Sequence, residues 1–227
     1  MSLDQPASST ELWRIYDQWG LRPEYLLPGL WIESGLNPGV ANQAGYPYYG
    51  LNQISASYLG GRGIDPNDYL TWSASRQLRE VVGPFIGGLI RDLGLLKSGV
   101  RFYQANFYPV SVRTAKAPGD PIVCAPSAAY EANKGLDRDH DGCIRVDDIQ
   151  VYIRQAAAAG PVRQAIAEAY AQRPSETPRD PVVGDEGGFP WGQVVAGGAV
   201  LAVAGATAYA IDDSLFRAAW RKFKRWL

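Results

Sequence analysis

The chain has 227 residues, of which 46% are hydrophobic and 20% charged, and its formal net charge is −1. This composition is typical of a globular protein with one substantial core and some chain left over. The charge is uneven, because residues 191–227 carry five basic side chains and two acidic ones while the preceding body is mildly acidic. A nucleic-acid-binding domain gathers its basic residues on one folded face. The pattern therefore argues against a nucleic-acid partner.

The first 173 residues are expected to form one mainly α domain. Apolar residues recur at helical spacing, and capping residues, prolines and glycines mark where helices begin and end. No segment carries a convincing β-strand pattern, so no strand is expected. Residues 111–135 are expected to be loop. The expected helices cover 11–20, 22–35, 55–59, 65–93, 100–109 and 161–173.

The N-terminus and the cysteines bear on the cellular compartment. The first ten residues, MSLDQPASST, have neither a basic start nor an apolar stretch, so we expect no cleavable secretory signal. The two cysteines, Cys124 and Cys143, are too few for a disulfide framework and lack zinc-binding spacing. The sequence leaves two alternatives open, which are one disulfide bridge between these cysteines or two unpaired thiols.

Glu33 is the only acidic residue between Leu30 and Asp65. It lies at the end of the second expected helix, directly after an apolar run. A carboxylic acid that donates a proton near neutral pH needs a raised pKa, and desolvation is the usual means. Taken alone, Glu33 fits an ordinary helix-terminal glutamate better than a catalytic acid, so its assigned role depends on the segments that follow.

Three segments follow one another in the order ESGLNP (33–38), YGLNQIS (49–55) and FYQANFYP (102–109). Together they resemble the three successive motifs of the lytic transglycosylases of the lysozyme-like superfamily. Those motifs read roughly Glu-Ser-X-X-Asn-Pro, then Gly-Leu-X-Gln, then a Tyr/Asn segment at the end of a helix. The resemblance covers about residues 10–155 and implies a lysozyme-like transglycosylase domain.

The resemblance implies a reaction for Glu33. It would be the general acid that protonates the glycosidic oxygen between N-acetylmuramic acid and N-acetylglucosamine. Its conjugate base would then deprotonate the C6 hydroxyl of muramic acid, which closes a 1,6-anhydro ring without water. The expected enzyme is a lyase that degrades peptidoglycan and needs no catalytic cofactor.

The resemblance also implies substrate-binding residues in all three segments. Ser34 would orient the acid or the departing sugar, and Gly50 would let the chain approach the glycan closely. Gln53 would bind near the acid or the N-acetyl group. The third segment departs from the common Ala-X-Tyr-Asn form. Tyr103 and Asn106 would together orient the acid and the muramoyl ring, and which of them faces the sugar is open.

A second carboxylate partner is missing from the expected window. Ordinary glycoside hydrolases use two carboxyl groups, one to protonate and one to attack or to activate water. Asp65 and Asp68 are the first acidic residues after Glu33, and both lie where a helix is expected to begin, which favours capping. A lyase fits this pattern better than a hydrolase. A single-glutamate muramidase of goose-lysozyme type is the alternative.

A second signature, DRDHDGCIRVDDI, covers residues 137–149. Its spacing matches an EF-hand calcium loop over 137–148, with Gly142 at the sharp turn and aspartate in place of the usual glutamate at position 12. A solvated acidic loop is the alternative. Because a single loop has no partner hand, a structural role for Ca²⁺ is expected. The loop also resembles one in some phage-type transglycosylase domains. The expected ligands are Asp137, Asp139, Asp141, the Cys143 carbonyl and Asp148.

The C-terminal part has the pattern of a membrane anchor. Residues 174–190 are rich in proline, glycine and charge and are expected to be a linker. Residues 191–211 carry no charge and are long enough for a transmembrane helix. Residues 212–227 alternate aromatic and basic side chains, which suits an anionic lipid surface. A buried Gly/Ala-rich helix in an assembly is the alternative.

The basic tail predicts a location for the enzyme. If the tail stays on the cytoplasmic side, the catalytic domain faces outward, toward peptidoglycan. Because no secretory signal is expected, we expect a phage virion to carry the protein. The virion would use it for local wall penetration during genome entry. The alternative location is the bacterial inner membrane. The expected partners are peptidoglycan glycan strands, a lipid bilayer through residues 191–227, and other virion proteins. A catalytically idle glycan-binding or structural component is the alternative from another class.

Overall fold

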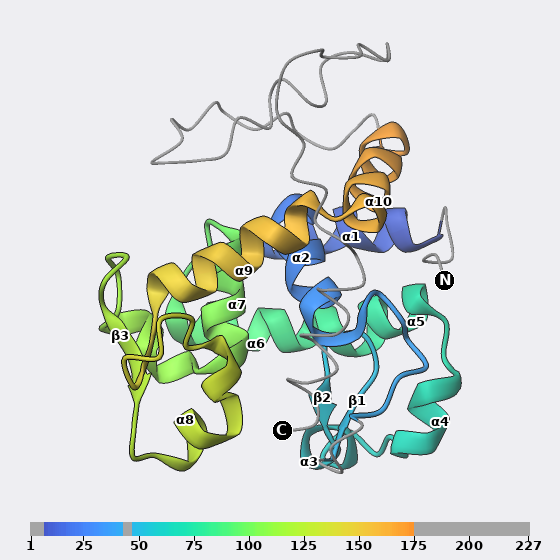
Figure 1. Cartoon of the computed structure of the whole chain (residues 1–227). Helices are drawn as coiled ribbons and strands as arrows, with labels where there is room; N and C mark the ends of the chain where they lie inside the picture. The colour runs from blue at the N-terminus through green and yellow to red at the C-terminus, as the bar shows by residue number, and fades with distance from the viewer. Residues whose placement is uncertain (1–6, 43–46, 175–227) are drawn as a thin grey trace, which may run out of the picture.

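The computed structural model describes residues 7–42 and 47–174, and this part of the chain is mainly helical, as predicted (Figure 1). The α-helices are α1 (Ala7–Trp19), α2 (Pro23–Ser34), α3 (Ala56–Gly60), α4 (Pro66–Thr71), α5 (Ala74–Gln77), α6 (Gly83–Leu93), α7 (Gly99–Phe107), α8 (Ala128–Asn133), α9 (Val146–Ala158) and α10 (Gly160–Ala171). A π-helical segment, η1 (Leu78–Val82), joins α5 to α6, and η2 (Pro109–Arg113) and η3 (Lys134–Leu136) are short 3₁₀ turns.

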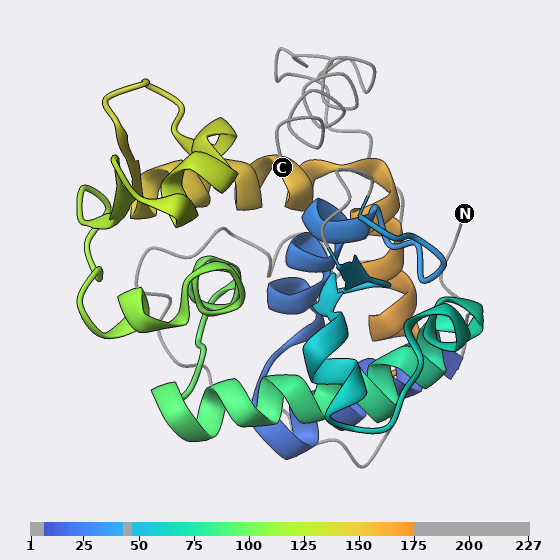
Figure 2. The ribbon, with the colours of Figure 1, turned by 90° about the horizontal axis from the view of Figure 1, so that it is seen from below.

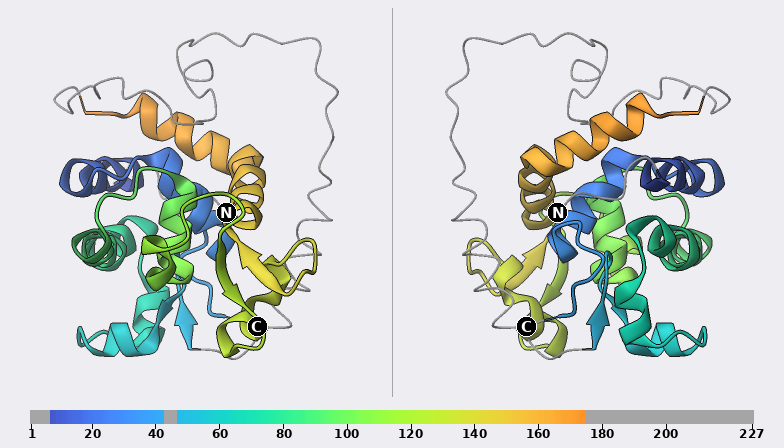
Figure 3. Two further views of the ribbon diagram at one scale, coloured as in Figure 1. Left: turned by 90° about the vertical axis from the view of Figure 1, so that its left-hand side faces the viewer. Right: turned by 90° about the vertical axis from the view of Figure 1, so that its right-hand side faces the viewer.

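The expectation of no β-strand was wrong. Two antiparallel pairs are present, one of β1 (Tyr48–Tyr49) with β2 (Ile54–Ser55) and one of β3 (Pro121–Cys124) with β4 (Cys143–Arg145). Figure 3 shows β3 and β4 running side by side. Strands of two to four residues are too short to show the alternating pattern by which a strand is recognised in a sequence.

The expected helix over 65–93 is broken in the structure. Helix α4 ends at Thr71 because Trp72 adopts an extended conformation, and the side chain of Ser73 accepts a hydrogen bond from the Arg76 N–H to start α5. A serine that caps a helix in this way supplies an acceptor for an N–H that has no partner within the helix. Two elements near the calcium signature were also not expected, namely α8 within the predicted loop and the long helix α9.

Helix α2 runs through the centre of the molecule and packs against α7, α9 and α10 (Figure 1). It begins with Pro23, whose missing N–H costs nothing in the first turn. It ends where Gly35 adopts a left-handed conformation, with φ of 65°, and donates its N–H to the Trp31 carbonyl. These two signals confirm the predicted helix over 22–35 and leave Glu33 in the last turn.

The end of α2 lies between two groups of elements. The β1–β2 pair with α3 and α4 occupies one side, and α8 with the β3–β4 pair occupies the other (Figure 1). Seen from below, α9 lies across one side of the molecule and α6 along the opposite side (Figure 2). The side chains that link α2 to the second group form what we call the α9 cluster, made of Ile32, Tyr103, Ala115, Ile122, Val123, Leu136, Ile144, Val146, Ile149, Ile153 and Ala156.

Several predictions concern residues outside the described part of the chain. These are the linker over 174–190 apart from Pro174, the transmembrane helix over 191–211 and the basic tail over 212–227. Among the helices of residues 7–42 and 47–174, none is both long and apolar enough to cross a bilayer.

Candidate active site and metal-binding loop

Glu33 is held between buried neighbours in the last turn of α2. Ile32 before it is 1% exposed and Ser34 after it is 7% exposed, whereas Glu33 itself is partly exposed. The Ser34 hydroxyl donates to the Leu30 carbonyl over 3.0 Å, one turn back in the same helix. Ser34 is thus bonded to its own helix, and its contribution to the site is to hold the helix end that carries the acid.

Helix α7 brings Tyr103 and Asn106 together at Glu33. The Nδ2 atom of Asn106 donates to Oε1 of Glu33 over 3.2 Å, and the Tyr103 hydroxyl donates to the same carboxylate. Residues three apart in a helix share a face. This spacing explains how both side chains reach one carboxylate although the third segment departs from the usual motif.

The buried Tyr103 hydroxyl keeps its proton at neutral pH. It is 4% exposed and belongs to the α9 cluster. Burial, together with the charge of the neighbouring Glu33 and the hydrogen bond to it, raises the pKa of Tyr103 well above its ordinary value. Its hydroxyl therefore stays neutral and keeps donating to Glu33 across the neutral range.

Gly50 and Gln53 build the tight turn between β1 and β2. Gly50 has φ of 71°, and a Cβ placed on it would lie 2.5 Å from Oε1 of Gln77 and 2.5 Å from Cε1 of Tyr69. Gln53 donates from Nε2 to the carbonyls of Gly50, over 3.0 Å, and Val40, over 3.3 Å. In the structure, these contacts of Gly50 and Gln53 stabilise the turn.

Asn52, on that same turn, is a site residue that the sequence did not single out. It is 2% exposed, and its Nδ2 atom donates to Oδ1 of Asn106 over 2.9 Å. The signal available in the sequence was a polar residue between two motif positions, Leu51 and Gln53. The structure thus joins all three segments in one chain of hydrogen bonds that ends at Glu33.

The first two acidic residues after Glu33 lie at the start of α4. The Oδ1 atom of Asp65 accepts the N–H groups of Asn67, over 2.8 Å, and Asp68, over 3.3 Å. Asp65 is the N-cap of α4, as expected, and Asp68 lies exposed in the first turn of that helix. Neither contact is with Glu33.

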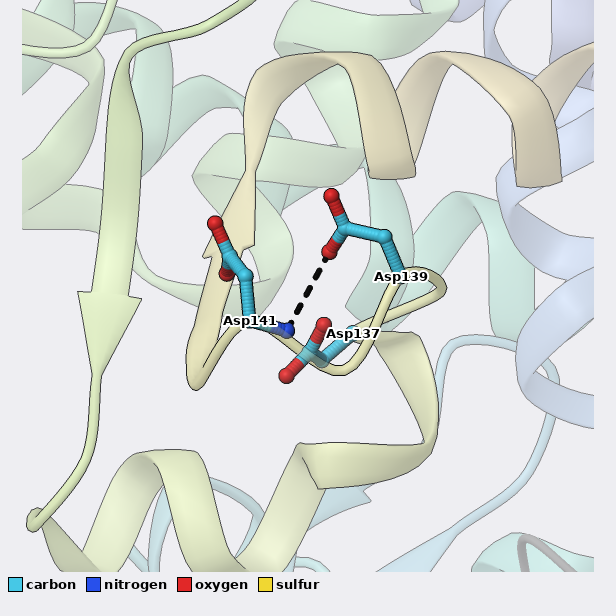
Figure 4. A group of neighbouring side chains, drawn as sticks. All are labelled: Asp137, Asp139 and Asp141. Carbon is cyan, nitrogen blue, oxygen red and sulfur yellow. Dashed lines mark hydrogen bonds between the residues drawn. The ribbon is translucent and has the colours of Figure 1, made fainter.

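The calcium signature forms a compact acidic loop between η3 and β4. One carboxylate oxygen from each of Asp137, Asp139 and Asp141 lies within 4.8 Å of the others. Figure 4 shows the three side chains converging, with the Asp141 N–H donating to Asp139 over 3.4 Å. His140, at position 4 of the loop, is exposed. Three carboxylates at this spacing are suited to a hard cation such as Ca²⁺.

Asp137 carries the observation that points to a cation. It is 1% exposed, and its Oδ2 atom accepts from the Tyr130 hydroxyl over 2.8 Å and from the Gly142 N–H over 3.0 Å. Its Oδ1 atom is buried with no hydrogen-bond partner in the described structure. Burial opposes ionisation of Asp137, but the hydrogen bonds outweigh it and lower the pKa of the carboxyl. A buried, ionised oxygen without a partner is costly unless a cation meets it, so these residues fit the predicted ion.

The remaining predicted ligands have structural partners of their own. Asp148 accepts the backbone N–H groups of Arg145, over 2.9 Å, and Arg138, over 3.3 Å, and so caps the start of α9. Cys143 is joined by a disulfide to Cys124, which resolves the two alternatives for the cysteines and leaves its carbonyl as the ligand atom of the pattern. Arg145 forms a 2.7 Å ion pair with Asp141 and would have to share that carboxylate with a metal ion.

Calcium is expected to stabilise the folded protein. At a concentration 100 times the dissociation constant, an ion that binds only the folded state adds about 2.7 kcal/mol, which corresponds to a rise in Tm of roughly 5–10 °C. The measurement is thermal unfolding in Ca²⁺ and after removal of Ca²⁺ by a chelator. Asp137→Asn should abolish the rise, whereas Asp147→Asn, an exposed carboxylate of the same loop at a non-ligating position, should retain it. Equal Tm values with and without Ca²⁺ for the unaltered chain would contradict the metal assignment.

No protein-family model, curated protein or solved structure matches this chain.

Proposed function

We propose that this protein is a peptidoglycan lytic transglycosylase with Glu33 as its catalytic acid and base. The observation that carries the proposal is the meeting of the three motif segments at one carboxylate. Asn106 and Tyr103 donate to Glu33 from α7, and Asn52 reaches Asn106 from the β1–β2 turn. A glutamate at an ordinary helix end needs no such convergence of residues that lie far apart in the sequence.

The hydrogen bonds suggest how Glu33 works. Asn106 donates to Oε1 of the carboxylate, and the protonated form of Glu33 is the acid. In the first half of the reaction, that proton moves to the glycosidic oxygen as the bond from this oxygen to C1 of N-acetylmuramic acid breaks. In the second half, the carboxylate takes the proton of the C6 hydroxyl, and O6 bonds to C1. Glu33 is then protonated again, and no water is consumed.

A lyase is favoured over a hydrolase by the acidic residues available. A hydrolase of the usual kind needs a second carboxylate within about 5–10 Å of the acid to attack or to activate water. The first candidates after Glu33 in the sequence are Asp65, which caps α4, and Asp68, which is exposed in the first turn of that helix. The substrate's own hydroxyl therefore replaces the second carboxylate in the proposed mechanism.

The calcium loop is assigned a structural role in this proposal. Asp137, Asp139 and Asp141, with the Cys143 carbonyl and Asp148, would hold Ca²⁺, which supplies positive charge for the buried Asp137 oxygen. Ile144 in this loop belongs to the α9 cluster, which also contains Ile32 and Tyr103. A well-ordered loop would thus support the packing beside Glu33.

Product analysis tests the proposal. Purified peptidoglycan is digested with the protein in Ca²⁺, and the fragments are identified by mass spectrometry. Products ending in 1,6-anhydromuramic acid are expected. Reducing muramic acid ends would instead identify a single-glutamate muramidase, and the absence of cleavage would indicate an idle glycan-binding or structural component.

The setting proposed for the enzyme is a phage virion, with an anchor over residues 191–227 and the catalytic domain directed at the wall. It depends on the sequence pattern alone. Detection of the protein in purified particles would support it, and its absence from them would contradict it.

A further inference from the structure

Asn106 can donate a hydrogen bond to ionised Glu33 in only one of the two orientations of its amide. An ionised carboxylate accepts hydrogen bonds and cannot donate them, so the NH₂ group of Asn106 must face it. The carbonyl oxygen of the same amide then points the other way and needs a donor. Asn52 supplies that donor, with its Nδ2 atom 2.9 Å from Oδ1 of Asn106.

Asn52 is itself held rigidly on the β1–β2 turn. On one side, the Leu51 N–H donates to Oε1 of Gln77 over 3.0 Å, and the Leu51 side chain is fully buried in the core. On the other side, the side chain of Gln53 bonds back to Gly50 across the turn over 3.0 Å. Because both neighbours are anchored, the backbone that carries Asn52 has a defined position, 54 residues away in sequence from the residue that its side chain contacts. The Oδ1 atom of Asn52 is buried with no hydrogen-bond partner in the part of the chain that the structure describes, so the bond to Asn106 is the one hydrogen bond of its amide there.

We propose that Asn52 is a positioning residue that orients the Asn106 amide so that its N–H, and not its carbonyl oxygen, faces Glu33. This inference rests on the proposed role of Glu33 as the acid and base. Rotating the Asn106 amide alone by half a turn, with Asn52 as it stands, would set NH₂ against the NH₂ of Asn52 and oxygen against the carboxylate, so both contacts would be lost together. We call the pair of hydrogen bonds from Asn52 to Asn106 and from Asn106 to Glu33 the relay. The relay favours the ionised form of Glu33, which is the form that must accept the C6 hydroxyl proton.

Two tyrosines of the described chain bear on a titration of Glu33. Tyr103 of α7 donates to it, and Tyr152 of α9 is the titratable group beside Tyr103. Burial raises the pKa of both tyrosines. Both hydroxyls stay neutral over the range in which carboxyl groups titrate, so neither tyrosine titrates together with Glu33.

The test is the titration of the Glu33 carboxyl in the full chain, followed by ¹³C NMR and assigned with Glu33→Gln. In Asn52→Asp, the new carboxylate cannot donate to Asn106, so the Asn106 amide turns and presents its oxygen to Glu33. The pH at the midpoint of the Glu33 titration, called the midpoint below, should then rise by about one pH unit or more. Asn52→Leu, which removes the donor without adding charge, should raise the midpoint by less.

A double variant separates positioning from general damage. If Asn52 acts through Asn106, Asn52→Leu should change the Glu33 midpoint in the unaltered chain but not in an Asn106→Leu background. Gln104→Met is the matched control. It removes another buried amide, which bonds to Ser111 and Ala115 instead of to the acid, and should leave the midpoint unchanged.

The outcomes distinguish this inference from the proposed function. An unchanged midpoint in folded Asn52→Leu, or equal shifts in both backgrounds, would overturn the positioning role. The titration needs no substrate, so a protein that cleaves no peptidoglycan would refute the function while the midpoints still test the relay. In an active enzyme, the alkaline limb of the kcat/KM profile should move in the same direction as the midpoint, because catalysis needs Glu33 protonated at the start.

Discussion

Glu33→Gln is expected to lower the rate of peptidoglycan cleavage by about 10³-fold, since a positioned general acid contributes on the order of 10²–10⁴-fold. Glutamine has the same shape, and its amide oxygen can still accept from Asn106 and Tyr103. It carries no acidic proton for the glycosidic oxygen and cannot take one from the C6 hydroxyl. The measurement is the initial rate of release of soluble fragments from purified peptidoglycan in Ca²⁺.

The control for this variant is the same substitution elsewhere in the same helix. Glu24 lies in the first turn of α2, is 7% exposed and accepts hydrogen bonds from the Tyr170 hydroxyl over 2.9 Å and 3.0 Å. Glu24→Gln should reduce the free energy of unfolding but keep most of the cleavage rate of the folded protein. If Glu33→Gln releases fragments as fast as the unaltered chain, Glu33 is not the acid and the proposed mechanism fails.

Gly50→Ala is expected to reduce the free energy of unfolding by about 2–5 kcal/mol. A left-handed conformation costs an alanine roughly 1–2 kcal/mol, and overpacking adds about 1–3 kcal/mol. The overpacking is specific, because the new Cβ would lie 2.5 Å from both Gln77 and Tyr69. Tyr69 is fully buried and Gln77 anchors the turn through Leu51, so neither can move aside easily. Urea unfolding measures the difference.

Gly63→Ala provides the matched comparison. Gly63 has φ of 70°, nearly the same as Gly50, but a Cβ there meets nothing within 4 Å. It should therefore show only the conformational part of the cost, roughly 1–2 kcal/mol. Equal losses in the two variants would mean that the packing around Gly50 yields, and that Gly50 is required for its conformation alone.

The predictions that succeeded depend on local signals. Pro23 and Gly35 mark the two ends of α2, and this placed Glu33 in the last helical turn without knowledge of the fold. The spacing of the three aspartates likewise specified a compact acidic loop, because the ligand positions of such a loop are consecutive in the chain. The mainly α character of the domain follows from helical periodicity, which is also a short-range property.

The predictions that failed or stayed open concern residues whose roles depend on distant partners. The assignment of Gly50 to the approach of the glycan stays a prediction, and the structure adds that its missing side chain makes room for Gln77 and Tyr69. The two cysteines could not be paired from spacing, because the pairing depends on β3 meeting β4.

By itself, the sequence determined the two ends of α2, the position of Glu33 in the last turn of that helix and the composition of the acidic loop. Each of these depends on backbone preferences and side chains within a few residues. Only the tertiary structure decided that Tyr103 and Asn106 both reach Glu33 and that Asn52 donates a hydrogen bond to the second of them. The physical reason is that a hydrogen bond between distant segments needs matched position and direction. Packing of α7 and the β1–β2 turn around α2 supplies both.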